Sequence, residues 1–238
     1  IGLIKKAIRK DGVTKKEFEA RVKKILAAKY WAGLNHYKDV SADHLIEDLN
    51  RGSAKALVQQ LCDNAVTLLK GDGSTLQLNP LQKTAIISVG VTQPTVFQRE
   101  LSQQWYLNSD MYIVGKATSA DQLLDLLVKL RQYDQIFVSI NDTRPRPASK
   151  LDYSNGVKLF ISELASFQHS VICVFANPYT IAGLPGIEKS GALIAGYQMS
   201  DEMQRSVVKV ITRLIDPKGR SPVRINQFFP SGSGVTLR

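Results

Sequence analysis

Between residues 84 and 197 the sequence alternates short apolar runs with longer segments of helical spacing, and this alternation most limits what the chain can fold into. Runs this short and this continuously apolar are typical of strands buried on both faces of a sheet. Strands that alternate with helices predict parallel pairing with helical crossovers. We therefore predict an α/β fold, a three-layer α/β/α sandwich with a mostly parallel sheet of about five to six strands. The strand-like runs span residues 84–90, 111–115, 135–141, 170–177 and 192–197.

Helices are expected between these runs, and two of them begin at good capping residues, Ser119 and Ser200. In the helix predicted over 119–131, the inner side is assigned to five apolar residues, Leu123, Leu124, Leu127, Val128 and Leu130. A strand is also predicted over 65–70, and a shorter one near 223–225. The other predicted helices cover residues 95–105, 155–167 and 200–214.

The region before the sheet is predicted to be a helical arm. Thr14 and Glu17 have the spacing of a capping box, which predicts a helix from there to about Trp31. Its apolar stripe is expected at Phe18, Val22, Ile25 and Leu26. A shorter helix over 3–10 should break at Asp11-Gly12, and another helix is predicted over 41–50.

We place the domain boundary after this arm, so that residues 1–50 form the arm and residues 51–238 the sandwich domain. The sandwich begins with a helix over 53–64, in which Ala54, Leu57, Val58 and Leu61 are expected to face inward. Because the sequence begins with Ile1 rather than Met, we expect it to be an internal piece of a longer protein.

The net charge of +10 is concentrated at one end of the chain. Residues 1–38 carry eleven Lys or Arg and three acidic residues, which leaves little excess charge for the remainder. A solvent-exposed lysine face on the arm explains this distribution better than a site for a polyanion, and no nucleic-acid-binding motif accompanies it. We therefore predict no nucleic-acid partner, and a binder driven by the basic arm stays the weaker alternative.

The sequence offers little for metal, cofactor or membrane chemistry. No apolar run approaches the roughly 20 residues that a membrane helix needs. Cys62 and Cys173 lie in apolar surroundings and are predicted to be buried thiols. The three histidines, His36, His44 and His169, are scattered, so we predict no metal site. The turn after residue 90 lacks a glycine-rich phosphate-binding pattern, so we predict no cofactor.

Ligands of open parallel sheets lie beyond the carboxyl ends of the strands, so any catalytic groups are expected at these ends. They contain no serine-hydrolase elbow, because Gly232-Ser233-Gly234 lies in a loop-like terminus. They also lack a convincing pair of carboxyl groups for glycoside hydrolysis, since Asp142 and Asp152 are the only candidates. We predict that the chain has no catalytic residue of its own.

The loop over 141–153 is the most unusual segment, because prolines and polar residues interrupt it. Asp142 is expected to form a turn. Arg144 and Arg146 either bind a carboxylate or sugar hydroxyls, or they hold the loop to a neighbouring domain, and the second interpretation is favoured. The residues predicted to contact a substrate rim or another domain are Asn141, Asp142, Arg144, Arg146, Asn177 and Tyr179.

The order of several motifs resembles the C-terminal α/β sandwich region of glycoside hydrolase family 3, especially bacterial β-N-acetylglucosaminidase-like members. The segment over 4–34 resembles the last helices of that family's barrel and the following linker. Residues 54–73 resemble a helix followed by a V-L-L-K strand, and residues 78–90 the start of the sandwich. Gly219-Arg220-Ser221-Pro222-Val223 resembles the closing G-[KR]-L-P-V segment, with Ser221 in place of Leu, and residues 175–181 resemble an N-P-Y strand end.

This resemblance implies a function for the parent protein rather than for the chain alone. In that family the nucleophile is an Asp on an N-terminal barrel, and some members carry an acid/base Glu on the loop that matches 141–153. That loop has no Glu here, which fits the branch that uses a barrel histidine. The resemblance thus implies a non-catalytic domain that supports the barrel of the same parent chain, with carbohydrate as a further partner and a periplasmic or extracellular location. The alternative is an independent sugar- or anion-binding module.

Overall fold

The computed structural model describes residues 1–10, 14–39, 41–76, 79–103, 108–146 and 148–237. The chain divides into two compact units, Ile1–Arg51 and Gly52–Arg238. The first unit contains three helices and a short 3-10 turn among its described residues: α1 (Gly2–Arg9), α2 (Lys15–Trp31), η1 (Leu34–His36) and α3 (Leu45–Leu49).

The capping box at the start of α2 is confirmed. The Thr14 hydroxyl accepts a hydrogen bond from the Glu17 amide, and the Glu17 carboxylate accepts one from the Thr14 amide. The predicted apolar stripe is only half right, because Phe18 and Val22 are half-buried whereas Ile25 and Leu26 are exposed. The helix predicted over 41–50 is reduced to α3, and the predicted break at Asp11-Gly12 lies outside the described residues.

The second unit is built around a six-stranded sheet in the order β1-β6-β5-β4-β2-β3. Five strands are parallel, and β1 pairs antiparallel with β6 at one edge. The predicted fold class is therefore confirmed. The strands are β1 (Thr67–Lys70), β2 (Thr84–Val89), β3 (Ser109–Val114), β4 (Gln135–Asn141), β5 (Ser170–Phe175) and β6 (Ala192–Ala195).

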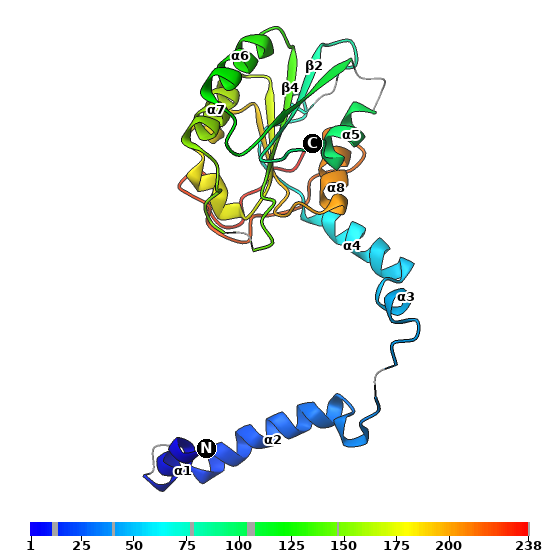
Figure 1. The fold of residues 1–238 in the computed structure, drawn as a ribbon, viewed down its shortest axis with the longest axis vertical. Coiled ribbons are helices and arrows are strands. Elements are labelled where there is room, and N and C mark those ends of the chain that lie inside the picture. Colours follow the sequence, from blue (N-terminus) through cyan, green and yellow to red (C-terminus); the bar gives the residue numbers. More distant parts are fainter. Residues whose placement is uncertain (11–13, 40, 77–78, 104–107, 147, 238) are drawn as a thin grey trace. The chain divides into compact units, whose positions relative to one another are not determined.

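Helices cover both faces of this sheet. Figure 1 shows α6 and α7 on one face and α5 and α8 on the other. Alternate residues of each central strand point to opposite faces, so Ile87 and Val138 pack under α6 and α7, whereas Ile86 and Phe137 pack under α5 and α8. The helical elements are α4 (Gly52–Ala65), α5 (Val96–Ser102), α6 (Ala120–Leu130), α7 (Asn155–Ser166), η3 (Pro178–Gly183), η4 (Ile187–Lys189) and α8 (Asp201–Ile211).

The helix starts follow from the sequence. Thr95 and Ser119 both form capping boxes, and Ser200 caps α8 as predicted. The predicted end of the first of these helices, at Trp105, lies outside the described residues. Cys62 and Cys173 are free and buried, and burial raises the pKa of both thiols, which keeps them unreactive as predicted. None of the described helices has the length and hydropathy to cross a membrane.

Three predictions for the second unit are wrong, and they concern α6, residues 223–225 and α4. On α6, Leu124 and Val128 are 60% and 69% exposed, because only the side with Leu123 and Leu130 meets the sheet. The short strand predicted near 223–225 is also absent from the described residues there, which form an irregular segment.

On α4 the residues predicted to face inward are largely exposed, namely Leu57, Val58 and Leu61. The side that meets α8 is polar instead. Asp63 accepts hydrogen bonds from Ser206 and Lys209, and Gln59 donates to Ser206. The regularly spaced apolar residues of this helix therefore lie on its exposed side, because an ion pair and hydrogen bonds hold the side that packs on α8.

Neighbouring leucines of α6 test this assignment. We expect Leu123→Ala to lower the free energy of unfolding by about 2–5 kcal/mol, because the side chain is 3% exposed and a cavity would remain. Leu124→Ala should change it by less than about 0.5 kcal/mol. Urea denaturation of both variants measures the difference, and equal losses would show that Leu124 is packed.

Candidate functional site

The candidate site lies at the carboxyl edge of the parallel strands. Strand β2 leads through α5 to β3 on one side, whereas β4 leads through α7 to β5 on the other. The adjacent strands β2 and β4 thus form a topological switch point, where the loops at the carboxyl ends separate and leave a crevice.

A cleft of about 760 Å³ occupies this position. The loop after β2, the loop after β3 and the start of α8 surround it. Its exposed polar side chains include Thr92, Gln93 and Thr143. Arg99, Lys116 and Asp201 add charges of both signs to its lining.

A second hollow of about 360 Å³ adjoins the cleft and shares Thr143 and Met199 with it. Asp142 and Arg144 line it together with Tyr197 and Gln198. Tyr197 adopts a left-handed backbone conformation with φ of 59°, which is uncommon for a non-glycine residue. Its hydroxyl lies 2.7 Å from Thr67 Oγ1, and this hydrogen bond fixes the ring.

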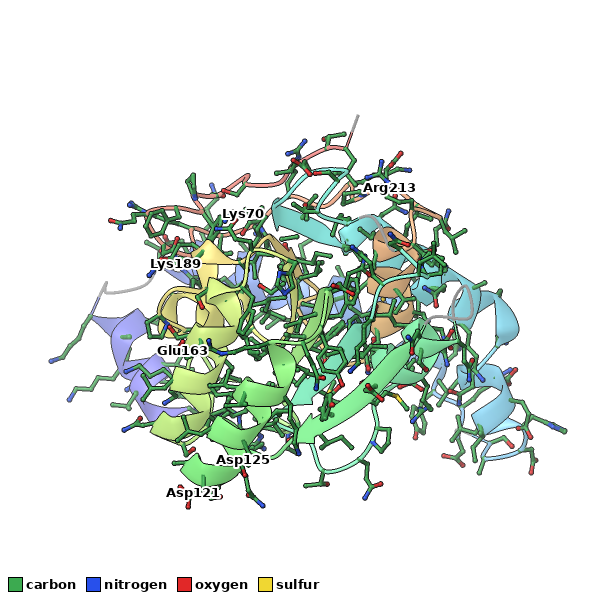
Figure 2. All side chains as sticks on the ribbon, turned by 90° about the horizontal axis from the view of Figure 1, so that it is seen from above. Lys70, Asp121, Asp125, Glu163, Lys189 and Arg213 are labelled. Atoms are coloured by element: carbon green, nitrogen blue, oxygen red, sulfur yellow. The ribbon has the colours of Figure 1, made fainter. Side chains whose placement is uncertain are left out.

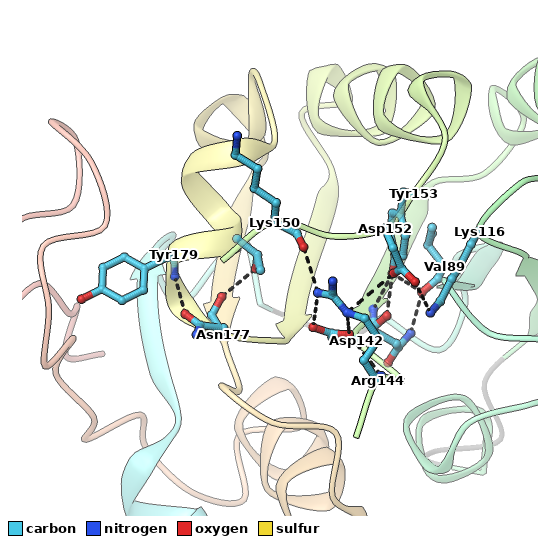
Figure 3. A network of polar contacts seen from close by, with 11 residues as sticks. Val89, Lys116, Asp142, Arg144, Lys150, Asp152, Tyr153, Asn177 and Tyr179 are labelled. Atoms are coloured by element: carbon cyan, nitrogen blue, oxygen red, sulfur yellow. Dashed lines mark hydrogen bonds and ion pairs between the residues drawn. The ribbon is translucent and has the colours of Figure 1, made fainter. Parts of the chain in front are cut away.

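Asp142 and Arg144 form a closed pair within the loop after β4 (Figure 3). Arg144 Nε and Nη2 each lie 2.7 Å from one oxygen of the Asp142 carboxylate, and the Arg144 amide donates to the same carboxylate at 3.2 Å. The guanidinium also donates to the Lys150 carbonyl. Asp142 is thus a turn former, as predicted, and Arg144 braces its own loop. The predicted contact of Arg144 with a substrate or a neighbouring domain stays a prediction.

Asp152 belongs to the same network. Lys116 Nζ from the loop after β3 lies 2.9 Å from its carboxylate, and Arg144 Nε lies 3.8 Å away on the other side. The hydrogen bond from Arg144 holds the pKa of Asp142 below its usual value, and the hydrogen bond from Lys116 does the same for Asp152. A general acid for glycoside hydrolysis needs a raised pKa, so neither carboxyl group suits that role.

Tyr153 fixes the far end of the loop. Its hydroxyl is buried between the carbonyls of Asn141, at 2.6 Å, and Val89, at 3.1 Å, and it accepts from the Asn141 amide. Burial raises the pKa of this phenol, so it stays protonated and acts as a structural donor. The loop after β2 accommodates it only because residue 90 is glycine, with φ of 89°.

The structure brings together some of the residues predicted for the site and separates others. Asn141 is fully buried, and its side-chain nitrogen Nδ2 donates to the Val89 and Ser139 carbonyls, so it has a structural role. Arg146 is exposed. The Asn177 side chain caps η3 by accepting from the Tyr179 amide, and the Tyr179 phenol points away from the Asp142–Arg144 pair (Figure 3).

The residues around the larger cleft were missed by sequence reasoning. The strand-end rule pointed to the correct edge, but the order of the strands decides which loops enclose the crevice. Among the described residues, no group of three or more His, Cys, Asp or Glu side chains is arranged to hold a metal ion.

The fold and this edge define a doubly wound α/β sandwich domain, and comparison with known proteins extends that assignment. No protein-family model and no curated protein matches the sequence. Among solved structures, a glycoside hydrolase family 3 β-N-acetylglucosaminidase from Paenibacillus sp. str. FPU-7 matches 90% of this chain and 40% of its own, with a TM-score of 0.57 and 17% identity.

Two β-glucosidase structures give a closer geometric match at lower identity. The enzyme from Erythrobacter marinus matches 98% of this chain and 42% of its own, with a TM-score of 0.66 and 10% identity. The enzyme from Listeria innocua matches 98% of this chain and 40% of its own, with a TM-score of 0.66 and 12% identity. The predicted resemblance is therefore confirmed at the level of the fold, and the chain spans about two fifths of each of these proteins.

Gly90 provides a test of how the loops are anchored. We expect Gly90→Ala to lower the free energy of unfolding by at least about 2 kcal/mol, because a methyl group would overlap the Tyr153 hydroxyl and the Asn141 carbonyl at a positive φ. Gly183→Ala is the control, since open space surrounds that position and its φ is not positive. Urea denaturation measures both, and a mild effect of Gly90→Ala would contradict the anchoring by Tyr153.

The Asp142–Arg144 pair predicts a dependence of stability on pH. Since the pKa of Asp142 is lower in the folded state, its stabilising effect is complete above about pH 5 and is lost as the pH falls through the folded-state value, below 3.8. Asp142→Asn should therefore lower the free energy of unfolding by about 1.5–3 kcal/mol at pH 7 and by less at pH 3.

The matched control is Asp125→Asn, because Asp125 lies on the outer surface of α6 (Figure 2). Urea denaturation at the two pH values should show little change for this variant. A loss of stability in Asp142→Asn that is the same at pH 3 and pH 7 would argue against the ion pair as its source.

Proposed function

We propose that this chain is the non-catalytic sandwich domain of a glycoside hydrolase family 3 enzyme, and that it supports a catalytic barrel in the same parent protein. The observation that carries the proposal is the fold match, which takes in 90–98% of this chain but only about two fifths of the glycosidase structures. The remainder of such a parent would hold the barrel and its nucleophile.

The chemistry of the loop over 141–153 supports a non-catalytic role. Its two carboxylates are paired with Arg144 and Lys116, and both have lowered pKa values. Proton transfer to a leaving group requires a carboxyl group that is protonated near neutral pH. In this proposal the domain lines the substrate cleft with hydroxyl and amide groups, and the barrel supplies the acid and the nucleophile.

The exposed apolar side of α4 supports docking of another domain. Leu57, Val58 and Leu61 are 55%, 43% and 62% exposed and lie within two turns of one helix. Several large apolar side chains together on a surface are typical of an interface. We further propose β-N-acetylglucosaminides as the substrates of the parent, and the periplasm or the cell exterior as its location.

Hydrolysis of an aryl N-acetyl-β-glucosaminide tests the proposal directly. The purified chain 1–238 should release no nitrophenol above the buffer rate, because it lacks a general acid and a nucleophile. A longer chain, translated from the reading frame that precedes Ile1, should contain a barrel and hydrolyse the substrate. Robust turnover by residues 1–238 would sink the proposal.

In that longer chain, Asp152→Asn should keep the rate within about tenfold, because a positioned general acid contributes about 10²–10⁴-fold. Substitution of the barrel aspartate by asparagine should abolish turnover. If Asp152→Asn instead lowers the rate by about 10²–10⁴-fold, acid catalysis belongs to this domain.

The cleft of about 760 Å³ favours one alternative, an independent sugar- or anion-binding module. It predicts heat in calorimetric titrations of residues 1–238 with amino sugars or inorganic phosphate, and loss of that heat in Gln93→Ala. Absence of heat at millimolar ligand would remove this alternative and leave the proposal for the parent enzyme unaffected.

A further inference from the structure

A separate cavity opens at the opposite edge of the sheet, where the central strands begin. Its volume is about 430 Å³, within the range of roughly 300–1,000 Å³ that small-molecule sites occupy. Residues before β2, at the start of β4 and just before β5 line it, so it is far along the strands from the cleft at their carboxyl ends.

The lining of this cavity is unusually polar. Four amide side chains, Asn79, Gln82, Gln135 and Gln168, line it, together with Asp134 and His169. Phe137 and Val171 form an apolar floor. Small-molecule sites are lined mainly by apolar side chains, so this composition favours a ligand that is itself rich in hydrogen-bonding groups. The described residues that line it include one carboxylate and no Lys or Arg, which disfavours an anion.

Part of the lining is held rigidly. Asn79 Oδ1 accepts from the Leu81 amide at 3.0 Å, and Asp134 Oδ2 accepts from the Lys83 amide at 3.0 Å. Gln82 Oε1 accepts from the Gln135 amide group. The other polar atoms of Asn79, Gln82 and Asp134, such as Asn79 Nδ2, therefore keep fixed directions, which lowers the entropic cost of binding a ligand.

The rim carries the unused hydrogen-bonding capacity. Among the described residues, the side chains of Gln168 and His169 have no hydrogen-bond partner, although both face the cavity. His169 is held by an edge contact with the Phe167 ring, 5.7 Å between centroids. An amide presents a donor and an acceptor side by side, and an imidazole ring adds two nitrogens at its edge, which together suit the donors and acceptors of adjacent hydroxyl groups.

We propose that this cavity is a second binding site, specific for a neutral polyhydroxylated ligand such as a glycosyl unit. The rigid amides and Asp134 bind hydroxyl groups from below, Phe137 and Val171 contact the carbon skeleton, and Gln168 and His169 close over the ligand from the rim. The site is independent of the proposed glycosidase function, because it uses none of the groups at the carboxyl edge.

Titration of residues 1–238 with glucose and with N-acetylglucosamine, followed by amide chemical shifts in NMR, tests this site. Saturable shifts are expected at Asp134, Gln168 and His169. Gln168→Ala and His169→Ala should each weaken the affinity by about tenfold, since each removes hydrogen bonds to the ligand. Both side chains are exposed, so these variants should fold normally.

The matched control is Gln227→Ala, an exposed glutamine that lines neither the carboxyl-edge cleft nor this cavity, which should leave the affinity unchanged. Three results would overturn the proposal: no saturable shift with either sugar at tens of millimolar, loss of binding in Gln93→Ala but not in Gln168→Ala, or tighter binding of inorganic phosphate than of the sugars at these residues.

Discussion

Strand β4 is the constraint on which the rest of the second unit depends. Every residue from Gln135 to Asn141 is buried, and the strand pairs in parallel with β2 on one side and with β5 on the other. A strand buried on both faces needs helices over both faces, which explains the long crossovers and their placement. Its two ends are then the only places where polar side chains can reach solvent.

At the carboxyl end this constraint explains why the loop over 141–153 is so firmly tied. The chain leaves a buried strand and must satisfy its backbone groups before it reaches solvent. The Tyr153 hydroxyl donates to the Asn141 and Val89 carbonyls, and the Asp142 carboxylate accepts from the Arg144 backbone amide. Arg144 then neutralises Asp142, so the groups that look reactive in the sequence are occupied in stabilising the loop.

The sequence predicted the elements well because their signals are local. Capping boxes at Thr14 and Ser119 and the short apolar runs lie within a few residues, so their physics can be read without the fold. The predicted burial of Leu124 was wrong because α6 has more apolar surface than the sheet covers, and that of Leu57 was wrong because α4 packs on α8 through its polar side. Strand order, and hence the enclosure of the 760 Å³ cleft, depends on pairing between residues about 50 positions apart. The hydrogen bond from Tyr153 to Val89 joins residues 64 positions apart, and no sequence motif predicts it.

The two edges of the sheet differ in what their polar side chains do: at one edge they stabilise loops, and at the other they are placed to bind a ligand. At the carboxyl edge Asp142 is paired with Arg144 and Asp152 with Lys116, and these ion pairs stabilise the loops beside the cleft. At the amino edge the side-chain amides of Asn79 and Gln82 are oriented by neighbours, while the side chains of Gln168 and His169 have no hydrogen-bond partner among the described residues. Ion-paired groups lose their mutual stabilisation when they turn to a ligand, whereas side chains without an internal hydrogen bond have no such stabilisation to lose. A fold shared with glycosidases therefore constrains the scaffold of this domain, and its ligand-binding capacity depends on which polar groups that scaffold leaves free.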